Sequence, residues 1–297
     1  MKTRLELADG GAEPREKLAK SHPGVLGSFA IAALFSWANT GSAVAATAPN
    51  LGSTATYGVV SSTFTNSNTS PQTIIKGDVC FTTGPTTPPL TITGTTVTPC
   101  PPSTGLDEGL ALANLNGQVC TFLGAAIALD AIVIGSNPPG TIPPGCYFSS
   151  GAMNITVSTT VTLNGAGVYI FRPGGALTTG ADSKVVLAGG ACASDVFWAP
   201  VGATTLGANS APSLITPTFA GNILDAAGVT LGHFANLTGR ALAFGGTVTA
   251  DANTITVPAC AAFTGGAAVP TISEWALLML VAVLAVAGFV AMRKRAA

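Results

Sequence analysis

Residues that could carry acid–base or nucleophilic chemistry are few in this chain, and they are scattered. Its 297 residues include two histidines, His22 and His233, and no P-loop, nucleophile elbow or HExxH pattern. Acidic residues are scattered along the chain, and the Asp and Asn residues of the turns are of the types that tolerate a left-handed backbone. We therefore expect no enzyme, no cofactor and no metal site. A β-helix enzyme acting on polysaccharides is the alternative, but it would need clustered acids and bases.

Six cysteines are the next residues with chemistry of their own. None forms a CxxC pair or lies near a histidine, so disulfides are expected rather than metal ligands. The candidates are Cys80, Cys100, Cys120, Cys146, Cys192 and Cys260. Six cysteines allow 15 pairings, and the sequence alone does not choose among them. The set we favour is Cys192–Cys260, Cys80–Cys100 and Cys120–Cys146.

Hydroxyl groups recur with a regular spacing in the second half of the chain. Four segments share a Gly, a short run of Thr and apolar residues, and a turn of small residues. They begin at Gly175, Gly202, Gly228 and Gly246, so successive starts are 27, 26 and 18 residues apart. A period near 20 with insertions predicts stacked units, and short runs rich in Thr, Val and Ile predict strands. The sequence therefore predicts a β-solenoid.

In such a stack the threonines of successive coils line up on one face. The candidates in these coils are Thr178, Thr179, Thr204, Thr205, Thr230, Thr247 and Thr249. The ordinary explanation is that Thr has a high β-propensity and stacks well on any solvent face. The functional hypothesis is a flat, rigid and uncharged surface of methyls and hydroxyls, which is suited to binding ice.

The composition supports an uncharged surface. Charged residues make up 8 % of the chain and hydrophobic residues 47 %. Between residues 46 and 260 there are four basic and eight acidic residues, a balance that excludes a basic footprint for nucleic acid. The hydrophobic fraction also argues against a disordered chain, because disordered segments contain few hydrophobic residues.

The elements expected before the repeats are mostly short strands. Strand patterns cover residues 51–60, 73–79, 90–97, 128–134 and 153–163. The stretch Thr104–Leu123 is different, because its apolar residues fall at helical spacing and Ser103 or Thr104 could cap it. We expect one helix there, packed along the β-stack.

Both ends of the chain have the composition of targeting segments. Residues 1–45 combine a polar start, an apolar run at 25–38 and the site Ala43-Val-Ala45, which predicts a signal peptide; an N-terminal membrane anchor is the alternative. Residues 261–270 read as a linker. Within 271–297, the uncharged stretch 275–292 would span about 27 Å as a helix and precedes Arg293-Lys-Arg295. We expect a transmembrane helix with a cytoplasmic basic tail and the body, 46–260, outside.

Several ordered motifs give the body a family resemblance. They are 51–60, Gly167-Val-Tyr-Ile-Phe, Ala193-Ser-Asp-Val-Phe-Trp, 219–224, 237–243 and Asn253-Thr-Ile. The chain resembles the DUF3494 ice-binding-like family over about residues 51–260. The resemblance implies an all-β-dominated fold: a discontinuous right-handed parallel β-helix of triangular section with one helix alongside. Members often carry T-A/G-x-T/N on the ice-binding face, and the stretch that fits best here adds Thr93, Thr95 and Thr96 as candidates.

The C-terminal segment resembles an IPTL-CTERM sorting signal. Its motif residues are Pro270, Thr271, Ile272, Ser273, Glu274 and Trp275. This resemblance implies a Gram-negative envelope and an exosortase-like protease as a partner. The combined prediction is an exported protein, at the cell surface or secreted after processing, that binds ice. The alternative is a structural or adhesive envelope protein that uses the same scaffold without ice affinity.

Overall fold

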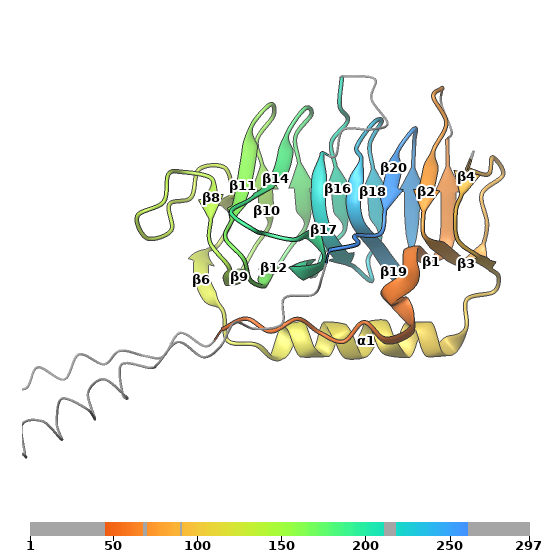
Figure 1. Ribbon diagram of the computed structural model, residues 1–297, viewed down its shortest axis with the longest axis horizontal. Coiled ribbons are helices and arrows are strands. Elements are labelled where there is room, and N and C mark those ends of the chain that lie inside the picture. Colours follow the sequence, from red (N-terminus) through yellow and green to blue (C-terminus); the bar gives the residue numbers. More distant parts are fainter. Residues whose placement is uncertain (1–44, 68–69, 90, 211–217, 261–297) are drawn as a thin grey trace, which may run out of the picture. The chain divides into compact units, whose positions relative to one another are not determined.

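The computed structural model describes residues 45–67, 70–89, 91–210 and 218–260 (Figure 1). They form a stack of parallel β-coils with one α-helix lying along it. No helix among these residues has the length and apolar character needed to cross a bilayer. The signal-peptide prediction up to residue 44, the linker, the sorting motif and the expected transmembrane helix all lie outside the described residues.

Each coil presents strands to three faces, which we name A, B and C. Face A is a parallel sheet in which every strand pairs in register with its neighbours. In spatial order its strands are β6 (Thr121–Gly124), β9 (Gly145–Ser149), β12 (Tyr169–Pro173), β15 (Val196–Trp198), β17 (Phe219–Leu224), the middle of β19 (Leu237–Ala250), the first half of β1 (Tyr57–Asn66), β3 (Asp78–Thr83) and β5 (Thr96–Val97).

Face B is built in the same way from shorter strands. In order they are β7 (Ile127–Ala128), β10 (Met153–Ile155), β13 (Leu177–Thr179), β16 (Thr204–Leu206), β18 (Val229–Leu231), the end of β19 and the end of β1. The strands β13, β16, β18 and the end of β19 are the four repeated segments of the sequence. The structure therefore confirms that these segments stack.

Face C closes each coil. Its strands are β8 (Thr141–Ile142), β11 (Thr160–Asn164), β14 (Lys184–Ala188), the starts of β17 and β19, β20 (Thr254–Thr256), β2 (Ile74–Lys76) and β4 (Thr91–Ile92). β19 runs through all three faces. At its first corner Gly239 lies against the carbonyl of Gly221, where a Cβ atom would overlap the backbone.

The order of the coils in space differs from their order in the chain. β1 pairs with β19 on one side and with β3 on the other, so the N-terminal strands extend the stack beyond the C-terminal coil. Helix α1 (Pro102–Gly117) then runs back along the stack and joins β5 at one end to β6 at the other (Figure 1). The N-terminal segment also contributes a short 3₁₀ helix, η1 (Gly52–Thr56), which contacts α1.

Two apolar clusters hold this arrangement together. The first fills the interior of the coils and includes a run of aromatic rings, Tyr147, Phe171, Trp198 and Phe219, with successive centroids 5.6, 4.2 and 5.0 Å apart. The second lies between the outer side of face A and α1, where Leu115 packs beside residues of β12, β17 and β19. The middle of face A is therefore buried on both sides, as parallel sheets usually are, whereas residues of β6 and β5 at its two ends are exposed.

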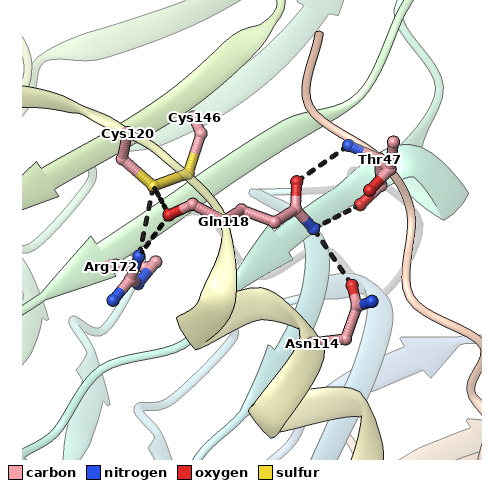
Figure 2. Close-up of a disulfide and its surroundings, with 6 residues drawn as sticks. All are labelled: Thr47, Asn114, Gln118, Cys120, Cys146 and Arg172. Atoms are coloured by element: carbon pink, nitrogen blue, oxygen red, sulfur yellow. Dashed lines mark hydrogen bonds between the residues drawn. A yellow bond between two sulfur atoms is a disulfide. The ribbon is translucent and has the colours of Figure 1, made fainter. Parts of the chain in front are cut away.

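Three disulfides join the described cysteines in the pairs that we favoured, Cys80–Cys100, Cys120–Cys146 and Cys192–Cys260. Figure 2 shows Cys120–Cys146 where α1 gives way to β6. Beside it, the Gln118 side chain accepts a hydrogen bond from Thr47 N and donates to Thr47 O, at 2.9 and 2.7 Å. The Arg172 guanidinium donates to the Gln118 carbonyl at 2.9 Å.

Three local predictions were wrong at their boundaries. In the strand expected over 51–60, Gly52–Thr56 form the 3₁₀ helix η1, and strand β1 begins only at Tyr57. The helix ends at Gly117 rather than Leu123, because Thr121 and Phe122 pair with β9 as strand β6. Neither Ser103 nor Thr104 caps it; the N-cap is Pro101, which leaves Pro102 in the first turn, where its missing N–H costs nothing. Of the strand expected over 128–134, only Ala128 is in a strand, β7. The residues that follow form a loop whose Ile132 and Ile134 pack against the interior cluster.

Candidate functional site

Face B carries a continuous row of small polar side chains. The pairings place Asn154, Thr178, Thr205, Thr230, Thr249 and Thr65 in register on six successive strands. We call these six residues the threonine row. Neighbouring parallel strands lie about 4.8 Å apart, so the row repeats a hydroxyl or amide group at that interval. All six side chains are exposed or half-buried.

A second row runs beside the first, two residues earlier in each coil. Its members are Ala152, Ala176, Ala203, Gly228, Thr247 and Thr63. Thr63 and Thr247 pair directly. We call these residues the small-residue row. No side chain in it is larger than Thr, and all of its members except the buried Gly228 are exposed or half-buried.

The flatness of face B follows from the residues between the rows. Strand alternation turns every second side chain inward. Leu177, Val229, Val248 and Phe64 each expose 1 % or less of their surface inside the stack. Packing at the density of a protein core therefore fixes the backbone that carries both rows.

Charged groups lie at the edge of face B and not in its rows. The Asp182 carboxylate accepts hydrogen bonds from Ser210 N and Ser210 Oγ at 2.6 and 2.8 Å, and these bonds lower its pKa. His233 Nδ1 and Asp251 Oδ2 lie 3.1 Å apart at the same edge. The edge charges are thus engaged in turns, which leaves the two rows uncharged.

The other faces offer no comparable surface among the described residues. Face A is covered by α1 and by η1. Face C carries exposed lysines at Lys76 and Lys184.

The structure brings together some of the threonines singled out in the sequence. Thr178, Thr205, Thr230 and Thr249 lie in the threonine row, and Thr247 lies in the small-residue row. Thr204 points inward: it is fully buried and donates a hydrogen bond to Asp225 Oδ2 at 2.6 Å. Thr179 is half-buried, and its hydroxyl accepts a hydrogen bond from Gly207 N at 2.9 Å.

The candidates Thr93, Thr95 and Thr96 lie elsewhere, at the corner between β4 and β5 in the last coil. Thr95 donates from both its backbone N and its hydroxyl to Asp78 Oδ1 at 2.7 and 2.9 Å, and Thr96 pairs with Val79 of β3. This corner is separated from the threonine row by a change of face. Thr93, Thr95 and Thr96 therefore do not share a surface with the threonine row.

Sequence reasoning missed Thr63, Thr65 and Asn154. The two threonines belong to β1, more than 180 residues before the strand they pair with. A signal for them was present, because Thr63-Phe-Thr65 has the alternation of Thr247-Val-Thr249. Nothing local to the sequence, however, indicated that the two segments are neighbours.

Titratable groups do not gather around either row. Burial raises the pKa of Glu108 of α1 to about 7, against the lowering effect of a hydrogen bond from Phe244 N. Glu108 lies beneath face A, in the helix interface. Among the described residues no group of His, Cys, Asp and Glu could hold a metal ion. In the described part of the chain, the two rows of face B are therefore uncharged.

Comparisons with known proteins agree with this geometry. Residues 38–256 match the ice-binding-like family, and residues 267–294 match the IPTL-CTERM motif. An ice-binding protein of Flavobacterium frigoris is 34 % identical over 131 residues, which cover 43 % of this chain and 45 % of that protein. An ice-binding protein of Nostoc sp. is 31 % identical over 219 residues, 72 % of this chain and 76 % of that protein.

Among solved structures, the crystal structure of an ice-binding protein from an Antarctic biological consortium superposes with a TM-score of 0.61 at 27 % identity. The superposition covers 73 % of this chain and 94 % of that protein. The alignment with the Flavobacterium protein, by contrast, spans less than half of that protein's length. Since the family match covers most of this chain and the coil architecture is shared, the chain belongs to the ice-binding-like family.

Proposed function

We propose that this chain binds ice through face B. The observation that carries the proposal is the threonine row, in which five threonines and one asparagine stand in register on successive strands. The matched relatives are named as ice-binding proteins, which supports the same ligand for this chain.

The physical basis is the regular spacing of the rows. Ice presents oxygen atoms at fixed intervals, and a rigid parallel stack repeats Thr side chains about every 4.8 Å. Each Thr offers a hydroxyl that binds water and a methyl that waters must enclose. Because the side chains are fixed before contact, binding loses little conformational entropy. The rows contain no charged side chains, which would hold water tightly and disturb an ordered water layer on the face.

We also propose a cellular setting for this chain. The body would be a right-handed, triangular β-helix without catalytic activity, exported by the N-terminal signal and presented at a Gram-negative cell surface or released. The apolar segment 275–292 would span the membrane until a sorting protease acts at residues 270–275. The IPTL-CTERM match over residues 267–294 supports this route.

The test is an ice assay on the full-length chain purified from an exporting bacterial host. We expect thermal hysteresis, faceted crystals and inhibition of recrystallisation at micromolar concentration. A chain that neither shapes crystals nor slows recrystallisation at high micromolar concentration would not be an ice binder. That result would favour the structural or adhesive envelope role on the same scaffold.

A further inference from the structure

The two rows of face B differ in composition along the stack. Directly before β10, β13 and β16 the small-residue row consists of alanines, and directly before β18 it is the buried Gly228. Only on β19 and β1 do both rows carry Thr: Thr247 and Thr249 on one strand, Thr63 and Thr65 on the other. We call these four residues the seam array, because they lie where the C-terminal coil meets the N-terminal strand.

The geometry of the seam array follows from its register. Thr63 pairs with Thr247, and Thr65 pairs with Thr249. Across the strands these partners are about 4.8 Å apart, and along each strand the two threonines are about 6.6 Å apart. Four Thr side chains therefore form a nearly rectangular patch, whereas the threonine row is flanked by alanine or glycine on the side of the small-residue row at β10, β13, β16 and β18.

Hydrogen bonds across the seam hold the array in place. The Thr65 hydroxyl donates to Thr249 Oγ1 at 2.8 Å, and Ser62 Oγ donates to Gly246 O at 2.8 Å. In η1, just before β1, the carbonyl of Ala55 accepts a hydrogen bond from Arg240 Nε of β19 at 2.9 Å. Phe64 is fully buried between Thr63 and Thr65. The seam is therefore fixed by hydrogen bonds and by packing.

We propose that the seam array is the centre of the ice-binding surface, with the rest of the threonine row extending it. This inference rests on the proposed function and names the part of face B that contributes most. A patch with two rows of Thr orders water in two dimensions, whereas a single row orders it along a line. The binding centre is thus assembled from both ends of the chain.

The experiment compares matched double variants of the full-length chain in thermal hysteresis and recrystallisation assays. Thr65→Tyr with Thr249→Tyr places two bulky rings in the seam. Asn154→Tyr with Thr178→Tyr places two rings at equivalent neighbouring positions at the far end of the same row. We expect activity to fall about tenfold in the seam variant and about twofold in the far-end variant, since few contacts dominate most interfaces. Circular dichroism melting checks that each variant folds.

A second pair of substitutions avoids bulk. Thr63→Ala with Thr247→Ala gives the seam the alanines found on the other strands, and we expect it to lower activity about threefold with little change in melting temperature. Equal losses in the two Tyr variants, or full activity in the Ala variant, would overturn the seam as the centre while leaving ice binding intact. A wild-type chain without ice activity would overturn both proposals.

Discussion

Both carboxylate oxygens of Glu108 accept a hydrogen bond from the backbone N–H of Phe244, at 3.2 and 3.1 Å. This contact joins α1 to β19 in the buried space beneath face A, where 3 % of Glu108 remains exposed. Because α1 is the one connection between the two ends of the stack, its attachment to the middle of the stack matters for the whole fold.

The first prediction concerns pH. Burial raises the pKa of Glu108 to about 7 from a reference value of 4.5, while the Phe244 hydrogen bond lowers it and Asp225 raises it. A raised pKa in the folded state means that the stabilisation is complete below pH 4.5 and is lost as the pH rises through 7. Glu108→Gln should remove a decline of about 3 kcal/mol in the free energy of unfolding between pH 5 and pH 8.

The measurement is urea unfolding at both pH values. Asp107→Asn is the control, because Asp107 is a neighbouring carboxylate whose pKa is lowered by hydrogen bonds from Ser53 and which stays ionised throughout this range. It should leave the decline unchanged. If Glu108→Gln retains the pH dependence of the wild type, Glu108 is not its source.

The second prediction concerns the middle of the threonine row. Thr205→Tyr combined with Thr230→Tyr should lower ice recrystallisation inhibition at least about threefold, because two adjacent rings interrupt the flat face. Both residues are exposed, so the melting temperature should stay within a few degrees of the wild type. Thr162→Tyr, on the outer side of β11 in face C, is the control. Equal effects at both places would mean that face B is not special.

The third prediction concerns the aromatic run inside the stack. Trp198 is fully buried, stacks on Phe171 with ring centroids 4.2 Å apart and donates from Nε1 to Ala220 O at 3.0 Å. Trp198→Ala should cost about 3–5 kcal/mol in urea unfolding, since it leaves a cavity between coils. Trp198→Phe keeps a ring there and should cost less. A smaller loss for Ala than for Phe would contradict this role.

The fourth prediction concerns the clamp at the N-terminal segment. Gln118 bonds both the N–H and the carbonyl of Thr47, and its amide also donates to Asn114 Oδ1 at 3.0 Å. Gln118→Ala should lower the free energy of holding residues 46–50 in place by about 1 kcal/mol per lost bond. Limited proteolysis should then cut this segment faster. Asn114→Ala, which removes only the Asn114 contact, should have a smaller effect.

Features determined by residues close together in the sequence could be predicted, whereas features determined by residues far apart in the sequence could not. The repeated coils from Gly175 onward were predictable because each one carries its own Gly, Thr and turn signals. The junction of β1 with β19 was not, because the paired residues are 184 apart and no local pattern records the pairing. Thr63 and Thr65 were missed for this reason.

Two smaller discrepancies have local causes. The apolar spacing continues through Val119 and Phe122 and therefore predicts a longer helix, but Phe122 pairs with β9 as part of strand β6. In Ala203-Thr-Thr-Leu206, alternation with the buried Leu206 assigns Thr204 to the interior and Thr205 to the surface. The difference between Thr204 and Thr205 could therefore have been predicted from the sequence, had strand alternation been applied to each threonine.

The position of β1 in the stack also affects the order in which its two edges can be paired during synthesis. The strand is made early, but its partner on the β19 side is synthesised 184 residues later. At about 5–20 residues per second, that is a delay of roughly 10–40 s. During it, one edge of β1 remains unpaired, and open strand edges are the usual starting points for association between chains. The hydrogen bonds that finally cover this edge are among the last that the growing chain can form.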